Sequence, residues 1–108
     1  MMEWTNKEID TFIGDKKSGY IYFYTPMCGT CQVASKMLSV IEKLLPELDS
    51  GKADLNFMPT MAERFEIESV PCLIIINKGD VQEKIYAFQS VPFLYEKLNT
   101  LAHVKTNG

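Results

Sequence analysis

Two cysteines separated by two residues, Cys28-Gly29-Thr30-Cys31, lie where the apolar segment 20–25 gives way to an amphipathic helix. A cysteine at the start of a helix lies against unpaired backbone N–H groups and the positive end of the helix dipole, and both favour thiolate over thiol. Cys28 is therefore the candidate nucleophile. The spacing brings Cys31 back over the first turn to within bonding distance of Cys28, so the pair can form and release a disulfide.

Length and charge restrict the class of protein. The 108 residues fit one compact domain, so we expect a single domain over residues 1–108. The formal net charge is only -3, and no run of lysine or arginine marks a nucleic-acid or membrane surface. The first residues lack the pattern of a secretory signal, and the longest apolar run, residues 70–76, is too short to span a bilayer. We expect a soluble cytoplasmic protein with neither nucleic-acid nor membrane partners.

Helix and strand patterns alternate along the chain. Helices are predicted after the capping boxes that begin at Thr5 and Thr60, over residues 31–48, and after the cap Ser90. Strands are predicted at residues 20–24, 53–57, 72–76 and 81–88, the last two as an antiparallel hairpin. The order predicts an α/β fold: a central mixed sheet, with parallel strands first and a C-terminal β-hairpin last, flanked by helices on both faces.

Taken together, these features resemble the thioredoxin family over nearly the whole chain. The match consists of the cysteine pair between a strand and a helix, Val70-Pro71 before a strand, the turn at residues 77–80, and the terminal amphipathic helix. The resemblance implies a thioredoxin-like fold and a thiol–disulfide oxidoreductase that needs no cofactor and no metal. The partners it implies are disulfide-containing protein substrates and a thioredoxin-reductase-type electron donor.

The expected reaction is protein-disulfide reduction. The thiolate of Cys28 attacks a disulfide of the partner, and Cys31 then resolves the mixed disulfide, which releases the reduced partner and the oxidised protein. Cys31, inside the helix, is expected to be buried and protonated until it is needed.

The resemblance also implies which residues bind the substrate. In the family, the proline that matches Pro71 is cis and lies against the disulfide, so a cis Val70–Pro71 bond is expected. Such a bend exposes the backbone of Val70, with which an extended substrate peptide can pair. Met27, on the apolar rim, and Gly29 and Thr30, between the cysteines, complete the predicted substrate-binding set.

Several residues depart from the family or have two interpretations. Tyr22 stands where the family carries a buried aspartate that assists deprotonation of the second cysteine, so resolution by Cys31 is expected to be slower or to rely on water. Lys52 either favours thiolate in the site or is a solvated strand-end charge. Cys72 is either a third redox thiol or a small buried hydrophobe, and we favour the hydrophobe. His103 is expected to interact with the end of the last helix or with solvent rather than to catalyse.

Three alternatives stay open. The first is a zinc or iron–sulfur site in which Cys72 or His103 joins the cysteine pair, although the chain has no second CxxC or CxxH. The second is a thioredoxin-fold binding module that uses the surface around Pro71 and has weak or lost redox activity. The third is a glutaredoxin-like, glutathione-using enzyme, ranked lower because residues 87–90 replace that family's paired glycines.

Overall fold

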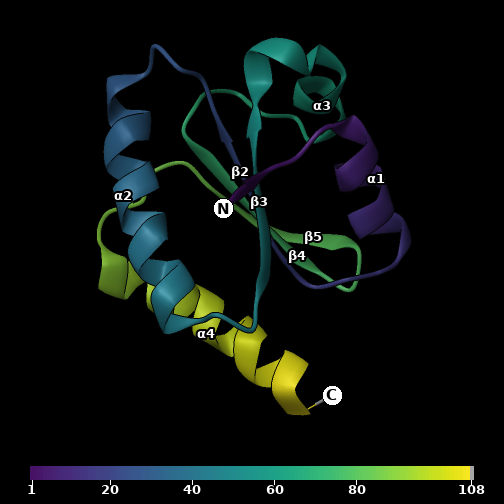
Figure 1. The fold of residues 1–108 in the computed structure, drawn as a ribbon, viewed down its shortest axis with the longest axis vertical. Coiled ribbons are helices and arrows are strands. Elements are labelled where there is room, and N and C mark those ends of the chain that lie inside the picture. Colours follow the sequence, from purple (N-terminus) through teal and green to yellow (C-terminus); the bar gives the residue numbers. More distant parts are fainter. Residues whose placement is uncertain (108) are drawn as a thin grey trace.

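The computed structural model describes the backbone of residues 1–107 and the side chains of residues 1–102. Its centre is a five-stranded sheet with the order β1-β3-β2-β4-β5 (Figure 1). The strands are β1 (Met2–Glu3), β2 (Gly19–Tyr24), β3 (Asp49–Asp54), β4 (Cys72–Asn77) and β5 (Asp80–Ile85). The other elements are the helices α1 (Asn6–Gly14), α2 (Gly29–Leu44), α3 (Pro59–Arg64) and α4 (Val91–Asn107), and the 3-10 turn η1 (Leu55–Phe57).

The directions of the strands follow from their connections. β1 and β2 both run parallel to β3, whereas β4 is antiparallel to β2 and β5 is antiparallel to β4. The chain passes from β2 to β3 through α2, which is the crossover that parallel neighbours require. Lys78 and Gly79 join β4 to β5 with φ angles of 51° and 86°, the signs found in the type I′ turns of hairpins. The predicted mixed sheet with its C-terminal hairpin is confirmed.

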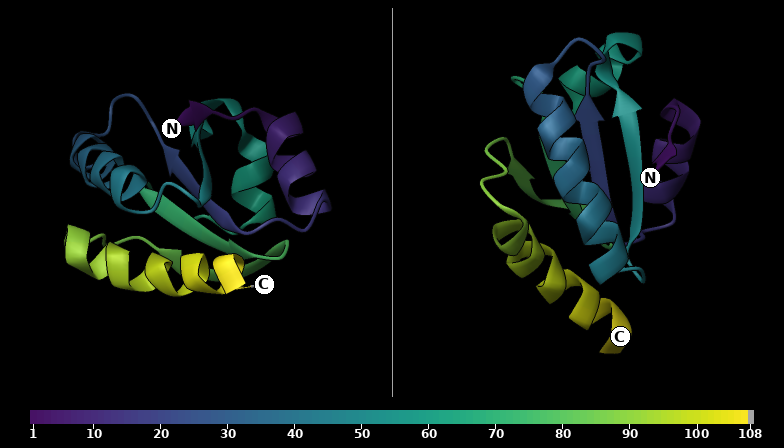
Figure 2. Two further views of the ribbon diagram at one scale, coloured as in Figure 1. Left: turned by 60° about the horizontal axis from the view of Figure 1, so that its bottom comes forward. Right: turned by 60° about the vertical axis from the view of Figure 1, so that its left-hand side comes forward.

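Side chains of β2 and β4 alternate between two core layers. One layer lies between the sheet and the helices α2 and α4, and the other between the sheet and α1 and α3 (Figure 2). The first layer receives Tyr20, Tyr22, Leu73 and Ile75, and the second receives Ile21, Phe23, Cys72, Ile74 and Ile76. Because both faces of these central strands are covered, their sequences are continuously apolar.

Two of the predicted helix caps are confirmed. The Glu8 carboxylate accepts a hydrogen bond from the backbone N–H of Thr5 at 2.9 Å, at the start of α1. The Ser90 hydroxyl accepts one from the backbone N–H of Phe93 at 3.2 Å, at the start of α4. Each bond satisfies a donor at or next to a helix start.

The long helix is shorter than predicted. α2 ends at Leu44, not at residue 48, and Leu45 already has the non-helical angles φ -129° and ψ 62°. Pro46 is the cause, because a proline excludes the preceding residue from helical geometry and has no N–H for the helix ladder. Leu45 and Leu48 are nevertheless buried in the core, which explains why the apolar pattern continues past the end of the helix.

The predicted bounds of three other elements are wrong. β3 covers residues 49–54 rather than 53–57, because pairing with β2 on one side and β1 on the other selects this polar stretch. Its end is set by Asp54, whose carboxylate accepts from the N–H of Asn56 at 3.0 Å and begins η1. α3 begins at Pro59, not with a cap at Thr60, since a proline at the first helical position needs no N–H partner. β5 ends at Ile85, where the chain leaves the sheet.

Candidate active site

The cysteine pair lies at the N-terminus of α2. Cys28 is the N-cap residue, with the extended angles φ -94° and ψ 111°, and Cys31 lies in the first turn. Their Cα atoms are 5.1 Å apart and their sulfurs form a disulfide. The backbone N–H of Cys31 donates to Sγ of Cys28 at 3.1 Å. A thiolate on Cys28 would therefore be placed at the positive end of the helix and already has one donor.

Exposure differs sharply between the two cysteines. Cys31 is 3% exposed, whereas Cys28 is only half-buried. Around Cys28 the surface is open: Met27 is 95% exposed, and Gly29 and Thr30 are also exposed. The Thr30 hydroxyl is 3.3 Å from Sγ of Cys28 and must be the donor, because a disulfide sulfur carries no hydrogen. A macromolecular partner can reach Cys28 but not Cys31.

Residues far apart in the sequence meet at this sulfur. The Val70–Pro71 peptide bond is cis, as the resemblance implied. The carbonyl oxygen of Val70 is 3.9 Å from Sγ of Cys28, and both Val70 and Pro71 are half-buried. This arrangement arises because β4, which begins directly after Pro71, pairs with β2, whose end leads into the cysteine motif.

A mainly apolar groove begins beside the disulfide. Thr30, Val33 and Met37 of α2 form one side, and Pro71 with the loop at residues 86–89 forms the other. Val33, which lines this groove, is 55% exposed. The loop at 86–89 is not part of the site predicted from the sequence, where a strand is predicted up to residue 88 and residues 87–90 are considered only as a replacement for the paired glycines of glutaredoxins. Its buried Phe88 and the positive φ of Gln89 are visible only in the fold.

A tyrosine lies beneath the cysteine pair. Tyr22 is 0% exposed, and its hydroxyl donates to the carbonyl oxygen of Cys31 at 2.7 Å. Burial raises the pKa of Tyr22 above its ordinary value, so the phenol is neutral at physiological pH. Of the residues with described side chains, no charged one is fully buried. Lys52 lies with Nζ 5.9 Å from the ring centroid of Tyr24.

The third cysteine lies in the other core layer. Cys72 is 0% exposed and packs with the residues under α1 and α3. Burial raises the pKa of its thiol to about 11, partly opposed by a hydrogen bond with Tyr86 and the charge of Lys84. A protonated, enclosed thiol is a poor nucleophile. The interpretation of Cys72 as a small buried hydrophobe therefore fits the structure.

Metal-binding side chains do not gather in the described part of the chain. Within residues 1–102, no group of three or more histidine, cysteine, aspartate or glutamate side chains could hold a metal ion. His103, the other candidate metal ligand, has its side chain outside the described residues. Among the helices that the structure describes, none has the length and apolar character needed to cross a membrane.

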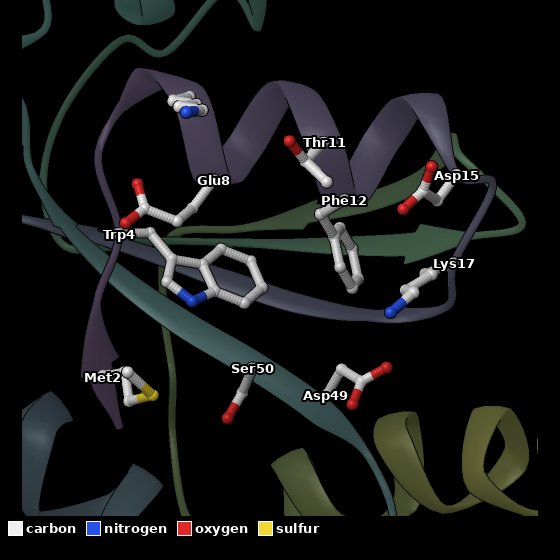
Figure 3. Close-up of a pocket in the computed structure, with 10 residues that line it drawn as sticks. Met2, Trp4, Glu8, Thr11, Phe12, Asp15, Lys17, Asp49 and Ser50 are labelled. Atoms are coloured by element: carbon white, nitrogen blue, oxygen red, sulfur yellow. The ribbon is translucent and has the colours of Figure 1, made fainter.

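A hollow of another kind lies between α1 and the start of β3, and its lining includes neither cysteine of the pair. Figure 3 shows Trp4 and Phe12 side by side on its floor, with ring centroids 5.0 Å apart. Trp4 also covers Gly51, where a Cβ atom would meet the indole. The aromatic pair thus closes the edge of the second core layer.

Fold and site together define a class. A disulfide at a helix N-terminus, with one accessible cysteine and a cis-proline against it, on a mixed sheet covered by helices, is the arrangement of thiol–disulfide oxidoreductases. The chain belongs to the thioredoxin family: a sequence model of that family, Thioredoxin, matches residues 1–99.

Individual relatives agree with this assignment. The thioredoxin-like protein YusE of Bacillus subtilis (strain 168) is 49% identical over 76 residues, which cover 70% of this chain and 72% of that protein. The oxidised mitochondrial thioredoxin 3 of Saccharomyces cerevisiae has the same fold, with a TM-score of 0.82 at 22% identity, over 94% of this chain and 95% of that one. A structure of the thiol-resolving mechanism in yeast mitochondrial 1-Cys peroxiredoxin via glutathione/thioredoxin systems matches with a TM-score of 0.83, at 22% identity and the same coverages. The protein is a thiol–disulfide oxidoreductase of this family.

Proposed function

We propose that the protein is a protein-disulfide reductase in which Cys28 attacks and Cys31 resolves. The Cys28 thiolate attacks one sulfur of the partner's disulfide, and the other partner sulfur leaves as a thiolate and takes a proton. Cys31 then loses its proton to water and, as a thiolate, attacks Sγ of Cys28; the bond from Cys28 to the partner sulfur breaks, and this second partner sulfur leaves as a thiolate and takes a proton. Two electrons pass to the partner, which becomes a dithiol, and the Cys28–Cys31 pair becomes the disulfide seen in the structure.

The observation that carries this proposal is the unequal exposure of the two cysteines. Cys28 is half-buried next to open surface, whereas Cys31 is 3% exposed. A bulky partner disulfide can approach only the first sulfur. The second sulfur reacts efficiently only within the chain, where the Cα–Cα distance of 5.1 Å is inside the range that a disulfide spans.

The substrate-binding residues of the proposal are Met27, Gly29, Thr30, Val70 and Pro71. All of them are exposed or half-buried around Cys28. The carbonyl of Val70, near the sulfur, is an acceptor that an extended partner segment can pair with, and the flexible thioether of Met27 suits a docking surface that adapts to different partners. Thr30 and Pro71 also line the apolar groove that leads away from the disulfide.

Disulfide-containing proteins are the proposed substrates, and a thioredoxin-reductase-type enzyme is the proposed electron donor. The yeast structure with the same fold concerns the thiol-resolving mechanism of a peroxiredoxin via glutathione/thioredoxin systems, which supports oxidised protein cysteines as the substrate class here. We place the reaction in the cytoplasm, where reducing conditions favour the reductase direction. We also propose that residues 1–108 act as one domain.

A redox titration combined with active-site variants tests the assignment. Free thiols are alkylated at a series of potentials and located by peptide mass spectrometry, with Cys72→Ser as the background to remove the third thiol. Reversible loss of label at Cys28 and Cys31 in one two-electron step is expected. If the two cysteines never form a disulfide, the assignment is wrong and a binding module is favoured. If a bound metal protects both of them from alkylation, a metal site is favoured instead.

Trapping separates the two roles. With Cys31→Ser, a model disulfide protein is expected to accumulate as a covalent adduct on Cys28, because the second attack is missing. Cys28→Ser is expected to form no adduct and not to reduce the disulfide of the same model protein. Full reductase activity of Cys28→Ser, measured as thiol release, would show that the roles are assigned wrongly.

A further inference from the structure

Strand pairing and two aromatic neighbours hold Tyr22 in place. It lies in the central strand β2, where it is paired in register with Lys52 of β3 and Leu73 of β4. Its ring stacks on Tyr24, with centroids 5.7 Å apart, and meets the edge of Phe88 at 6.0 Å. Strand pairing fixes the backbone of Tyr22 and the two rings fix its side chain, so the hydroxyl has little freedom to follow a moving partner.

The hydroxyl of Tyr22 connects to the first turn of α2. It accepts a hydrogen bond from the Ser35 hydroxyl at 3.2 Å and donates its own proton to the carbonyl oxygen of Cys31 at 2.7 Å. On the other side of the same residue, the N–H of Cys31 donates to Sγ of Cys28 at 3.1 Å. Cys31 is thus held by its N–H to the attacking sulfur and by its carbonyl to a rigid tyrosine, in the disulfide form.

Resting on the proposed function, we infer that Tyr22 is a positioning residue that favours the disulfide over the dithiol by fixing the main chain of Cys31. When the disulfide is reduced, the two sulfurs move apart from bonding distance to van der Waals contact. In this proposal the first turn of α2 relaxes with them, whereas the phenol of Tyr22, fixed by the sheet and by the rings of Tyr24 and Phe88, does not. The hydrogen bond to the Cys31 carbonyl is consequently best formed when Cys31 is bonded to Cys28.

Tyr22 does not transfer a proton in this scheme. Its phenol is buried and neutral, and its proton is engaged with the Cys31 carbonyl rather than with either sulfur. In the resolving step, the Cys31 thiolate attacks Sγ of Cys28, the bond from Cys28 to the partner sulfur breaks, and the electron pair leaves on that sulfur. Tyr22 raises the effective concentration of Cys31 at Cys28 in this step.

Two variants distinguish a positioning role of Tyr22 from a purely structural one. Tyr22→Phe keeps the ring and removes only the hydroxyl. Ser35→Ala is the matched control, because it removes the other hydrogen bond of Tyr22 and leaves the one to Cys31 in place. The equilibrium constant for forming the Cys28–Cys31 disulfide is measured against glutathione, in a Cys72→Ser background, beside the thermal unfolding of both redox forms.

With Tyr22→Phe, the equilibrium constant is expected to fall about two- to tenfold, the range that one intramolecular hydrogen bond provides. The thermal stability gap between the oxidised and reduced forms should narrow by the matching amount. Ser35→Ala should change the equilibrium constant clearly less. In the unsubstituted protein, exchange of the Tyr22 hydroxyl proton, followed by NMR, should be slower in the oxidised form.

The inference is overturned if Tyr22→Phe lowers stability equally in both redox forms and leaves the equilibrium constant unchanged, because Tyr22 is then only structural. An equally large effect of Ser35→Ala would overturn it too. Should Tyr22→Phe fail to fold, equal hydroxyl exchange in the two forms of the unsubstituted protein would overturn it as well. Failure of the unsubstituted protein to form the disulfide reversibly would instead contradict the proposed function, so the two failures are distinguishable.

Discussion

At the scale of single residues, Gly51 shows how closely the edge of the sheet is packed. A Cβ atom at this position would lie 1.9 Å from the indole of Trp4. We expect Gly51→Ala to lower the free energy of unfolding by about 1–3 kcal/mol, the usual result of overpacking a core, because Trp4 must leave Phe12. Chemical denaturation followed by Trp4 fluorescence measures both the stability and the displaced ring.

Gly14 is the matched control for this substitution. It is the last residue of α1, and a Cβ atom there meets no other atom within 4 Å. Alanine is a better helix former than glycine, so Gly14→Ala should leave the stability unchanged or raise it by up to about 1 kcal/mol. If both substitutions reduced stability alike, the loss at Gly51 would not come from Trp4.

Residue-scale features differ in how far the sequence predicts them. Strand alternation alone indicates that Cys72 can point away from Cys28, and the structure places it in the opposite core layer. The hydrogen bond from Tyr22 to the Cys31 carbonyl could not be predicted. It depends on how α2 lies across β2, and the identity of a tyrosine says nothing about which acceptor its hydroxyl reaches.

At the scale of elements, a lysine from β5 secures the end of α3. Nζ of Lys84 donates to the carbonyl oxygens of Phe65 and Glu66, each at 3.0 Å. These carbonyls lie at and just past the end of α3, where a cation also meets the negative end of the helix dipole. Lys84→Met keeps the apolar stem and removes the donor. We expect it to lower the free energy of unfolding by about 1 kcal/mol, measured by urea denaturation.

Lys36→Met provides the comparison, since Lys36 is exposed in the middle of α2. It should change the stability by less than about 0.5 kcal/mol, as surface substitutions usually do. Equal effects of the two variants would mean that the loss of a positive charge, rather than the bonds to α3, determines the result.

Elements with strong local patterns were predictable, and those selected by tertiary pairing were not. The runs at residues 20–24 and 72–76 are apolar throughout and appear as β2 and β4. β3 is the polar sequence Asp49–Asp54, which becomes a strand because β1 and β2 pair with it on either side. β1 itself has two residues, too few for any periodicity. Local propensity is a weak guide wherever neighbouring strands decide the structure.

At the scale of the whole molecule, the order of helices and strands along the chain was sufficient to predict most of the fold. Alternating helices and strands followed by a hairpin imply a mixed sheet with both faces covered, and the structure has this arrangement (Figure 2). The active site follows from the same topology, because β2 leads into Cys28 while β4 begins directly after Pro71, and the two strands are neighbours. The groove beside the disulfide could not be predicted from the sequence, because α2 and residues 86–89, which line it, come together only in the folded chain.

Burial on both faces of the sheet also makes the molecule sensitive to alkali. Burial is the main cause that raises the pKa of Cys72 to about 11 and that of Tyr20 to about 12, against ordinary values of about 8.5 and 10. A group with a raised pKa in the folded state contributes stability that is fully present below its unfolded pKa and is lost as the pH rises through its folded pKa. The free energy of unfolding should therefore be level up to about pH 8.5 and fall between about pH 8.5 and 12.

Cys72→Ala tests the contribution of the Cys72 thiol to the decrease in the free energy of unfolding at alkaline pH. The substitution lowers stability at neutral pH, because it removes a buried sulfur, but it also removes the titrating group. The difference in free energy of unfolding between Cys72→Ala and the unsubstituted protein should accordingly shrink between about pH 8.5 and 11. Tyr20→Phe should make the fall in the free energy of unfolding less steep, and only above about pH 10. Urea denaturation of the oxidised form across this range keeps Cys28 and Cys31 from titrating. Parallel curves for Cys72→Ala and the unsubstituted protein would show that the Cys72 thiol titrates alike in the folded and unfolded chain, and that its burial does not protect the proton.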